Sequence, residues 1–122
     1  MNRPMLVREV MTIGVPVCHD AETCSAVLGR LKGDVVVALD DDGMACGWLT
    51  HAQLAANTSQ LVGTVMDEGI PTISPETPIE TAAILMRAQQ VQYLFLMHDW
   101  PGEPRPSALI SLSAIEERLA HA

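Results

Sequence analysis

The chain has 122 residues, of which 48% are hydrophobic and 18% are charged, and its formal net charge is −8. This length fits one compact domain or two small subdomains that share a core, and the apolar fraction is too high for a disordered chain. Fifteen acidic side chains against seven basic ones argue against a nucleic-acid partner, because such surfaces need clustered cations. The same balance argues against docking on anionic lipid.

The sequence predicts no membrane partner and a cytoplasmic location. The longest apolar run near the centre, residues 35–39, is far shorter than the roughly 18 to 20 residues that cross a bilayer. Charged residues near the N-terminus interrupt the stretch in which a signal peptide would be hydrophobic. The three cysteines are an odd number without CxxC spacing, which is typical of reduced thiols in the cytoplasm.

An internal repeat organises the chain. Residues 7–11 (VREVM) resemble residues 62–66 (VGTVM) at an offset of 55, and the same offset aligns residues 14–16 (GVP) with residues 69–71 (GIP). Apolar residues then follow helical spacing in both copies. These positions are Cys24, Val27, Leu28 and Leu31 in the first copy, and Ile79, Ala82, Ala83 and Met86 in the second. Thr77 and Glu80 predict a capping box, with Pro78 at the first helical position.

A hairpin and a further helix are predicted after this helix in each copy. In the first copy, strands at residues 35–39 and 45–50 flank a tight turn at residues 40–43 (DDDG), and a short helix covers residues 51–56. In the second copy, strands at residues 93–97 and 108–111 precede a helix that ends at residue 120. The hairpin loop of the second copy, residues 99–106, is longer and rich in proline, which cannot pair as a strand.

This ordered series, given twice, resembles a pair of CBS domains, also called a Bateman module. The resemblance rests on the Val-x-x-Val-Met segments, the proline in the first strand, the Asp-Asp-Gly hairpin turn and residues 47–50 (GWLT). It implies an α/β (α+β type) fold, with two small sheets flanked by helices and pseudo-twofold symmetry. Repeat 1 then covers residues 6–58 and repeat 2 covers residues 60–120. The family implies a regulatory module rather than an enzyme, and the chain resembles a stand-alone pair.

The resemblance also implies candidate ligand-binding residues. The family's nucleotide-binding signature is a glycine, two apolar residues, Thr or Ser, and an aspartate three positions later that accepts the ribose hydroxyls. Both hydroxyl residues are present, whereas Gln53 and Ala114 stand in place of the two aspartates. An amide oxygen can accept one ribose hydrogen bond and a methyl group cannot. The candidate residues are Val15, Pro16, Gly47, Thr50, His51 and Gln53 of repeat 1, and Ile70, Pro71, Ser111 and Ala114 of repeat 2.

Several of these residues have a purely structural alternative. Thr50 and Ser111 either contact a ligand or only cap the helices that follow them. His51 either assists an anion or is an ordinary surface residue, and Trp48 either lines the cleft or packs. The aspartates at positions 40–42 are interpreted as a solvated turn, because they lack the spacing of a calcium loop. No nucleophile or metal-ligand pattern occurs, so neither catalysis nor a metal is expected.

The sequence therefore predicts a regulatory or sensory module that binds a small adenosine-containing ligand between the repeats and signals through a homodimer. AMP, ATP and S-adenosylmethionine are the candidate ligands, and no cofactor is required. Without a ribose-binding carboxylate, and with a net charge of −8, AMP and ATP are expected to bind weakly. Neutral or cationic adenosyl compounds are the better candidates, in the cleft of repeat 1. The alternative is a ligand-free module for protein–protein interaction.

Overall fold

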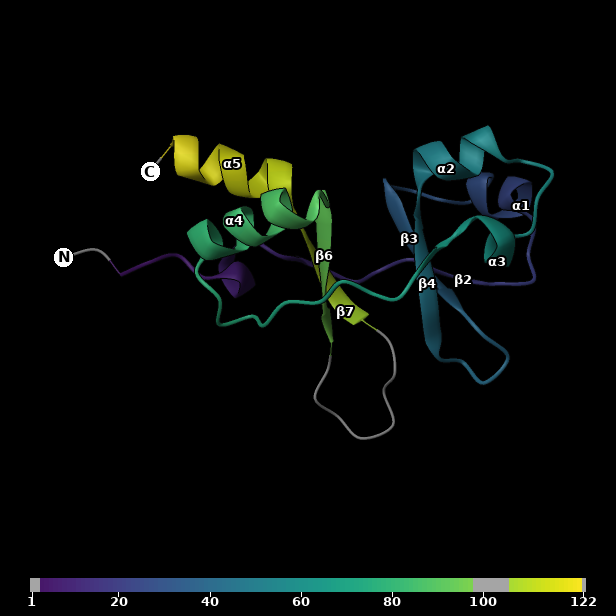
Figure 1. The fold of residues 1–122 in the computed structure, drawn as a ribbon, viewed down its shortest axis with the longest axis horizontal. Coiled ribbons are helices and arrows are strands. Elements are labelled where there is room, and N and C mark those ends of the chain that lie inside the picture. The colour runs from purple at the N-terminus through teal and green to yellow at the C-terminus, as the bar shows by residue number, and fades with distance from the viewer. Residues whose placement is uncertain (1–2, 98–105, 122) are drawn as a thin grey trace. The chain divides into compact units, whose positions relative to one another are not determined.

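The computed structural model describes residues 3–97 and 106–121 and divides them into two compact units. Unit 1 contains residues 3–14, 71–97 and 106–121, and unit 2 contains residues 15–70. Each unit has its own small β-sheet with helices packed beside it (Figure 1). The predicted α/β class with two small sheets is confirmed, while a twofold axis between the repeats stays a prediction.

Unit 2 is built on a four-stranded sheet in the order β2-β3-β4-β5. Its strands are β2 (Val17–His19), β3 (Val35–Leu39), β4 (Ala45–Thr50) and β5 (Asp67–Glu68), and its helices are α1 (Cys24–Leu28), α2 (His51–Ala56) and α3 (Val62–Val65). β2 runs parallel to β3, whereas the β3–β4 and β4–β5 pairs are antiparallel. The predicted strands at residues 35–39 and 45–50 and the helix at residues 51–56 are confirmed.

The core of unit 2 lies between this sheet and its helices. Its buried members are aliphatic residues and two thiols, namely Cys18, Cys24, Val27, Val36, Ala38, Leu49, Leu54 and Val62. The predicted helical face contributes Cys24 and Val27, which are 0% and 1% exposed. Removing such side chains from water is the main favourable term in folding. The core thus fixes the end of β4 and the start of α2, where the candidate site of repeat 1 lies.

Unit 1 has a three-stranded sheet in the order β1-β7-β6. Its elements are β1 (Thr12–Ile13), β6 (Tyr93–Met97), β7 (Pro106–Ser111), the 3₁₀ helix η1 (Val7–Glu9) and the helices α4 (Ile79–Gln89) and α5 (Leu112–Ala120). The predicted face of α4 is buried, since Ile79, Ala82, Ala83 and Met86 all belong to the core of the unit. The predicted elements at residues 93–97 and 108–111 and the helix ending at residue 120 are confirmed.

The predicted capping box at the start of α4 is wrong. Pro78 is the N-cap residue rather than the first helical residue, and no side chain caps this helix. The reason lies in the backbone, because the amide of Ile79 donates to the carbonyl of Met5 at 2.9 Å. An extended segment therefore satisfies a helix-start donor that a capping side chain would otherwise serve.

In each unit, a backbone hydrogen bond joins the first segment of one repeat to the other repeat. In unit 1 the amide of Val7 donates to the carbonyl of Thr77 at 2.8 Å. In unit 2 the amide of Val62 donates to the carbonyl of Glu22, also at 2.8 Å. The first segment of each repeat (residues 7–11 or 62–66), called its lead segment, thus pairs with the chain just before an α-helix of the other repeat. This helix is α4 for residues 7–11 and α1 for residues 62–66. The compact units consequently differ from the two stretches of chain that the repeats occupy.

The turn at residues 40–43 has the predicted tight geometry. A carboxylate oxygen of Asp40 accepts hydrogen bonds from the amides of Asp42 and Met44, at 2.9 and 3.0 Å. Gly43 has φ 78°, a conformation that costs glycine little. Pro106, predicted to lie in the proline-rich loop that cannot pair as a strand, is instead the first residue of β7 and lies opposite Met97, so this part of the prediction is wrong. The rest of the loop predicted at residues 99–106 lies outside the described residues. Among the helices that the structure describes, none is long and apolar enough to cross a membrane.

Candidate functional site

The candidate site of repeat 1 is organised by a reciprocal cap at the start of α2. The hydroxyl of Thr50 accepts from the amide of Gln53 at 3.2 Å, and the side-chain oxygen of Gln53 accepts from the amide of Thr50 at 2.8 Å. The Thr50 hydroxyl also donates to this Gln53 oxygen at 3.3 Å. Thr50 thus caps α2, while its contact with a ligand stays a prediction. The amide oxygen that was expected to accept a ribose hydroxyl already serves the backbone and hydroxyl of Thr50.

Gln53 connects this cap to a carboxylate that the sequence reasoning missed. Its side-chain nitrogen donates to Oδ2 of Asp67 at 3.3 Å. Asp67 lies on β5, directly opposite Trp48 of β4, so the sheet register brings it beside the start of α2. Trp48 itself is 9% exposed. Sequence spacing alone gave no signal for Asp67, because a two-residue edge strand has no recognisable pattern.

The corresponding place in unit 1 lacks both polar groups. Ser111 caps α5 by accepting from the amide of Ala114 at 3.2 Å, and its contact with a ligand stays a prediction. Ala114 has only a methyl group where Gln53 has an amide. The partner of β7 is β1, in which Thr12 lies opposite Leu109, so Thr12 corresponds to Asp67 by register. The two repeats therefore differ at their helix starts in charge and in hydrogen-bonding capacity.

Gly47 has a structural reason to be glycine. A Cβ at this position would lie 2.5 Å from Sδ of Met66 and 2.7 Å from the carbonyl oxygen of Asp67. Real Cβ atoms essentially never approach other atoms so closely. The absent side chain lets β5 approach β4, and this approach places Asp67 beside Gln53.

Three of the remaining candidate residues, Pro16, Pro71 and His51, form backbone hydrogen bonds within their own unit. The carbonyl of Pro16 accepts from Val37 at 2.9 Å, and in unit 1 the carbonyl of Pro71 accepts from Phe95 at 2.8 Å. Pro16 is exposed, whereas Val15, Ile70 and Pro71 are half-buried. The amide of His51 donates to the carbonyl of Asp34 at 2.7 Å, and its side chain is exposed.

A pocket of about 230 Å³ in unit 2 contains only Pro16 of the predicted site residues. It is lined by Pro16, Val17, Val27, Arg30, Leu31, Lys32 and Val36. Arg30 is held by two hydrogen bonds to the carboxylate of Glu22, at 2.6 and 2.7 Å. The guanidinium group lowers the pKa of Glu22 to about 2, since it stabilises the charged carboxylate.

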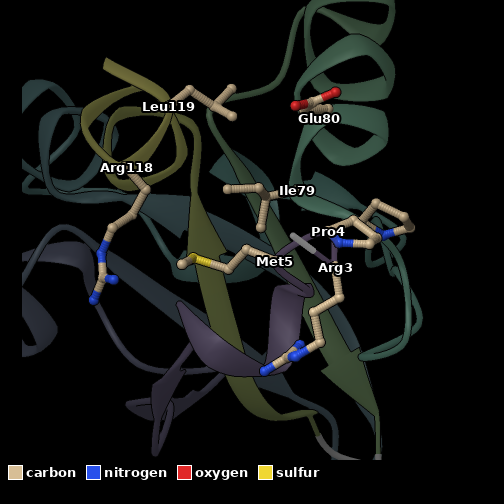
Figure 2. A pocket seen from close by; sticks show the side chains of 8 residues that line it. Arg3, Pro4, Met5, Ile79, Glu80, Arg118 and Leu119 are labelled. Carbon is tan, nitrogen blue, oxygen red and sulfur yellow. The ribbon is translucent and has the colours of Figure 1, made fainter. Parts of the chain in front are cut away.

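A larger pocket, of about 490 Å³, lies in unit 1 and contains none of the predicted site residues. Its lining residues are Arg3, Pro4, Met5, Pro78, Ile79, Glu80, Arg118 and Leu119. Figure 2 shows that they come from residues 3–5, the start of α4 and the end of α5. Arg3 pairs with Glu9 at 2.6 Å and lowers the pKa of that carboxyl to about 2.

The three cysteines are free thiols. Burial raises the pKa of Cys18 to about 11 and also raises the pKa of Cys24 and Cys46. Because the thiolate is the reactive form, all three are poor nucleophiles near neutral pH. Cys18 and Cys24 are buried and Cys46 is half-buried.

His19, Asp20 and Asp41 come together near the turn after β3, a grouping that the sequence analysis did not predict. One ligand atom from each lies within 4.8 Å of the others. Nδ1 of His19 accepts from the amide of Ala21 at 3.0 Å, and Nε2 faces Asp41 at 2.8 Å. Asp41 is 94% exposed, so this group lies at the surface of unit 2.

Comparison with known proteins gives the same interpretation for the second half of the chain. Residues 62–118 match the family model of the CBS domain. The second repeat is a CBS domain. No curated protein sequence matches the chain. The solved structures that resemble it therefore show its fold through geometry rather than through close sequence relationship.

The whole chain has the fold of a CBS-domain pair. It superposes on the CBS domain pair of protein MJ0100, in complex with 5′-methylthioadenosine and S-adenosyl-L-methionine, with a TM-score of 0.79 and 15% identity over 98% of each chain. The CBS-domain containing protein ATU1752 from Agrobacterium tumefaciens gives a TM-score of 0.75 and 17% identity, over 92% of this chain and 91% of that one.

A third similar structure is the cytosolic domain of the Mg²⁺ channel MgtE in complex with ATP. Its TM-score is 0.72 with 18% identity, over 89% of this CBS pair. The match covers 46% of that solved chain, so the CBS pair spans less than half of its length.

Proposed function

We propose that this CBS pair is a regulatory module, without catalytic activity, that binds an adenosyl compound in unit 2. The observation that carries the proposal is the linked group of Thr50, Gln53 and Asp67 at the start of α2. Unit 1 has Ala114 and Thr12 at the corresponding places, which offer no carboxylate. The similar structures that contain 5′-methylthioadenosine, S-adenosyl-L-methionine or ATP support an adenosine-containing ligand.

The local chemistry favours a neutral or cationic ligand over a phosphorylated one. α2 has only six residues, and the hydroxyl of Thr50 is engaged in its cap. The nearby Asp67 and the net charge of −8 both repel phosphate groups. S-adenosylmethionine and 5′-methylthioadenosine are therefore expected to bind more tightly than AMP or ATP.

Isothermal titration calorimetry with these four compounds tests the proposal. We expect binding of one equivalent of S-adenosylmethionine or 5′-methylthioadenosine per chain, and at least about tenfold weaker binding of AMP and ATP. Thermal unfolding provides a second readout, because a ligand at 100 times its Kd stabilises the folded state by about 2.7 kcal/mol. Absence of binding by all four compounds contradicts the proposal, as does a preference for ATP.

A second candidate function is protein–protein interaction, and the outer face of α4 favours it. Ile84 and Leu85 are 64% and 40% exposed, opposite the buried face of the same helix. We propose that this face forms a homodimer contact in the cytoplasm, since adjacent exposed aliphatic residues often mark interaction surfaces. Sedimentation velocity on the wild type and on Ile84→Glu tests the contact. A wild type that stays a 13.2 kDa monomer at micromolar concentration contradicts it.

A further inference from the structure

We infer that the pocket of about 490 Å³ in unit 1 binds a small carboxylate with an apolar body. This pocket shares no residue with the adenosyl site proposed for unit 2. Cavities of this size are typical of small-molecule sites, which combine apolar walls with a few polar groups. The internal repeat explains why the pocket is open in unit 1, and its lining indicates what it binds.

In unit 2 a turn of the chain covers the start of α1. The first two helical residues are Cys24 and Ser25. The amide of Cys24 donates to the carbonyl of Gln60 at 2.8 Å, and the amide of Ser25 donates to the carbonyl of Thr58 at 3.0 Å. The turn is closed by the amide of Gln60, which donates to the carbonyl of Asn57 at 2.9 Å. Residues 57–60 thus occupy this place in unit 2.

Unit 1 repeats only the first of these two helix contacts. The offset of 55 aligns Ile79 and Glu80, the first two residues of α4, with the first two residues of α1. The amide of Ile79 donates to the carbonyl of Met5 at 2.9 Å, but the described residues give the amide of Glu80 no hydrogen-bond partner. Both residues line the pocket. The pocket therefore lies at the place that a turn covers in unit 2.

The sequence of unit 1 disfavours such a turn. By the same offset, Pro4 stands where unit 2 has Ser59, the third residue of the turn. Proline is disfavoured at the third position of a type I turn, because it forces the preceding residue out of the helical conformation. That preceding residue is Arg3, whose side chain forms two hydrogen bonds with the carboxylate of Glu9, at 2.6 and 2.9 Å. These residues keep the pocket open.

The charges at the pocket favour a carboxylate. Arg118 lines it from the end of α5, and its guanidinium group forms no ion pair within the part of the chain that the structure describes. Glu80 also lines the pocket, but Figure 2 shows the guanidinium groups of Arg3 and Arg118 on the side away from its carboxylate. Two of the seven basic side chains thus line one pocket in a chain of net charge −8. A guanidinium group binds a carboxylate through two parallel hydrogen bonds.

The rest of the pocket is apolar. Five of its eight lining residues form this wall, namely Pro4, Met5, Pro78, Ile79 and Leu119. Met5 is 36% exposed, so an apolar body in the pocket would remove it from water. The ligand therefore needs an apolar part beside Met5 and a carboxylate for Arg118. A short aliphatic carboxylate has both.

Titration with hexanoate and with hexanamide, followed by NMR of the backbone amides, tests the inference. Hexanamide has the same apolar chain without the charge. We expect hexanoate to shift the amide resonance of Glu80 and to leave that of Ser25, its counterpart in unit 2, unchanged. Hexanamide is expected to bind at least about fivefold more weakly, because hydrogen bonds between charged groups are stronger than those between neutral groups.

Three variants locate the site. Arg118→Gln is expected to weaken hexanoate to the level of hexanamide. Arg87→Gln is the matched control and should bind hexanoate like the wild type, because Arg87 is an exposed arginine of the same unit that pairs with Glu116 at 3.3 Å and lines neither pocket. Met5→Trp is expected to abolish binding, because the indole ring would fill the pocket. Circular dichroism confirms that each variant folds.

A wild type in which hexanoate does not shift the Glu80 amide would overturn the inference. Hexanamide that binds as tightly as hexanoate would overturn it too, as would unchanged hexanoate binding by Arg118→Gln or by Met5→Trp. Arg118 is exposed, so its variant decides the question if Met5→Trp does not fold. The adenosyl proposal stands or fails separately, because its residues lie in unit 2.

Discussion

Replacing Gly47 by alanine tests the close approach of β4 and β5. The new Cβ would lie 2.5 Å from Sδ and 2.8 Å from Cγ of Met66, and 2.7 Å from the carbonyl oxygen of Asp67. The flexible Met66 side chain can move away, but the carbonyl is part of the paired strand and moves only if β5 does. Overpacking of this kind costs about 1 to 3 kcal/mol. The lower entropy of the unfolded alanine chain offsets about 0.4 to 1 kcal/mol of that cost.

We therefore expect Gly47→Ala to lower the free energy of unfolding by about 1 to 2 kcal/mol. Urea unfolding followed by circular dichroism measures this change, with the slope m checked for constancy. Gly29→Ala is the matched control, because its Cβ would meet its nearest neighbours at 3.6 and 3.7 Å, which is ordinary contact. That control is expected to be neutral or slightly stabilising. If Gly47→Ala is as stable as Gly29→Ala, the packing argument is refuted.

Three further predictions concern acid stability, thiol reactivity and assembly. The pKa of Glu22 is lowered from its ordinary 4.5 to about 2, so the Glu22–Arg30 pair stabilises the fold fully above pH 4.5 and progressively less as the pH falls toward 2. Glu22→Gln should flatten the pH dependence of stability in this window, as measured by urea unfolding, and an unchanged profile would contradict the assignment. Cys46 is half-buried, whereas Cys18 and Cys24 are buried. Iodoacetamide followed by mass spectrometry should therefore modify Cys46 first in the folded protein, and equal rates at all three thiols would be inconsistent with this burial. Ile84→Glu should shift the sedimentation coefficient of the homodimer to that of a monomer, while Glu80→Gln, on the same helix, should leave it unchanged.

Much of the fold could be predicted from the sequence because the repeat doubled the information for each element. Strands such as residues 35–39 are continuous apolar runs between turn signals, and Thr50 is followed by Gln53 at capping spacing. The start of α4 could not be predicted, because the amide of Ile79 at this start donates to the carbonyl of Met5, which is distant in sequence. Asp67 was missed for a related reason, since only the pairing of β5 with β4 brings it to Gln53.

The exchanged lead segments have a consequence for folding. A fragment that ended near residue 58 would lose Gln60, whose carbonyl accepts from the amide of Cys24 at 2.8 Å, and Val62, which is 0% exposed. Neither half of the chain would then contain every segment that its own core requires. The two halves, expressed as separate polypeptides, should remain largely unfolded alone and recover native circular dichroism when mixed. Because both repeats lie in one polypeptide, the segment that each core needs from the other repeat is present at high effective concentration.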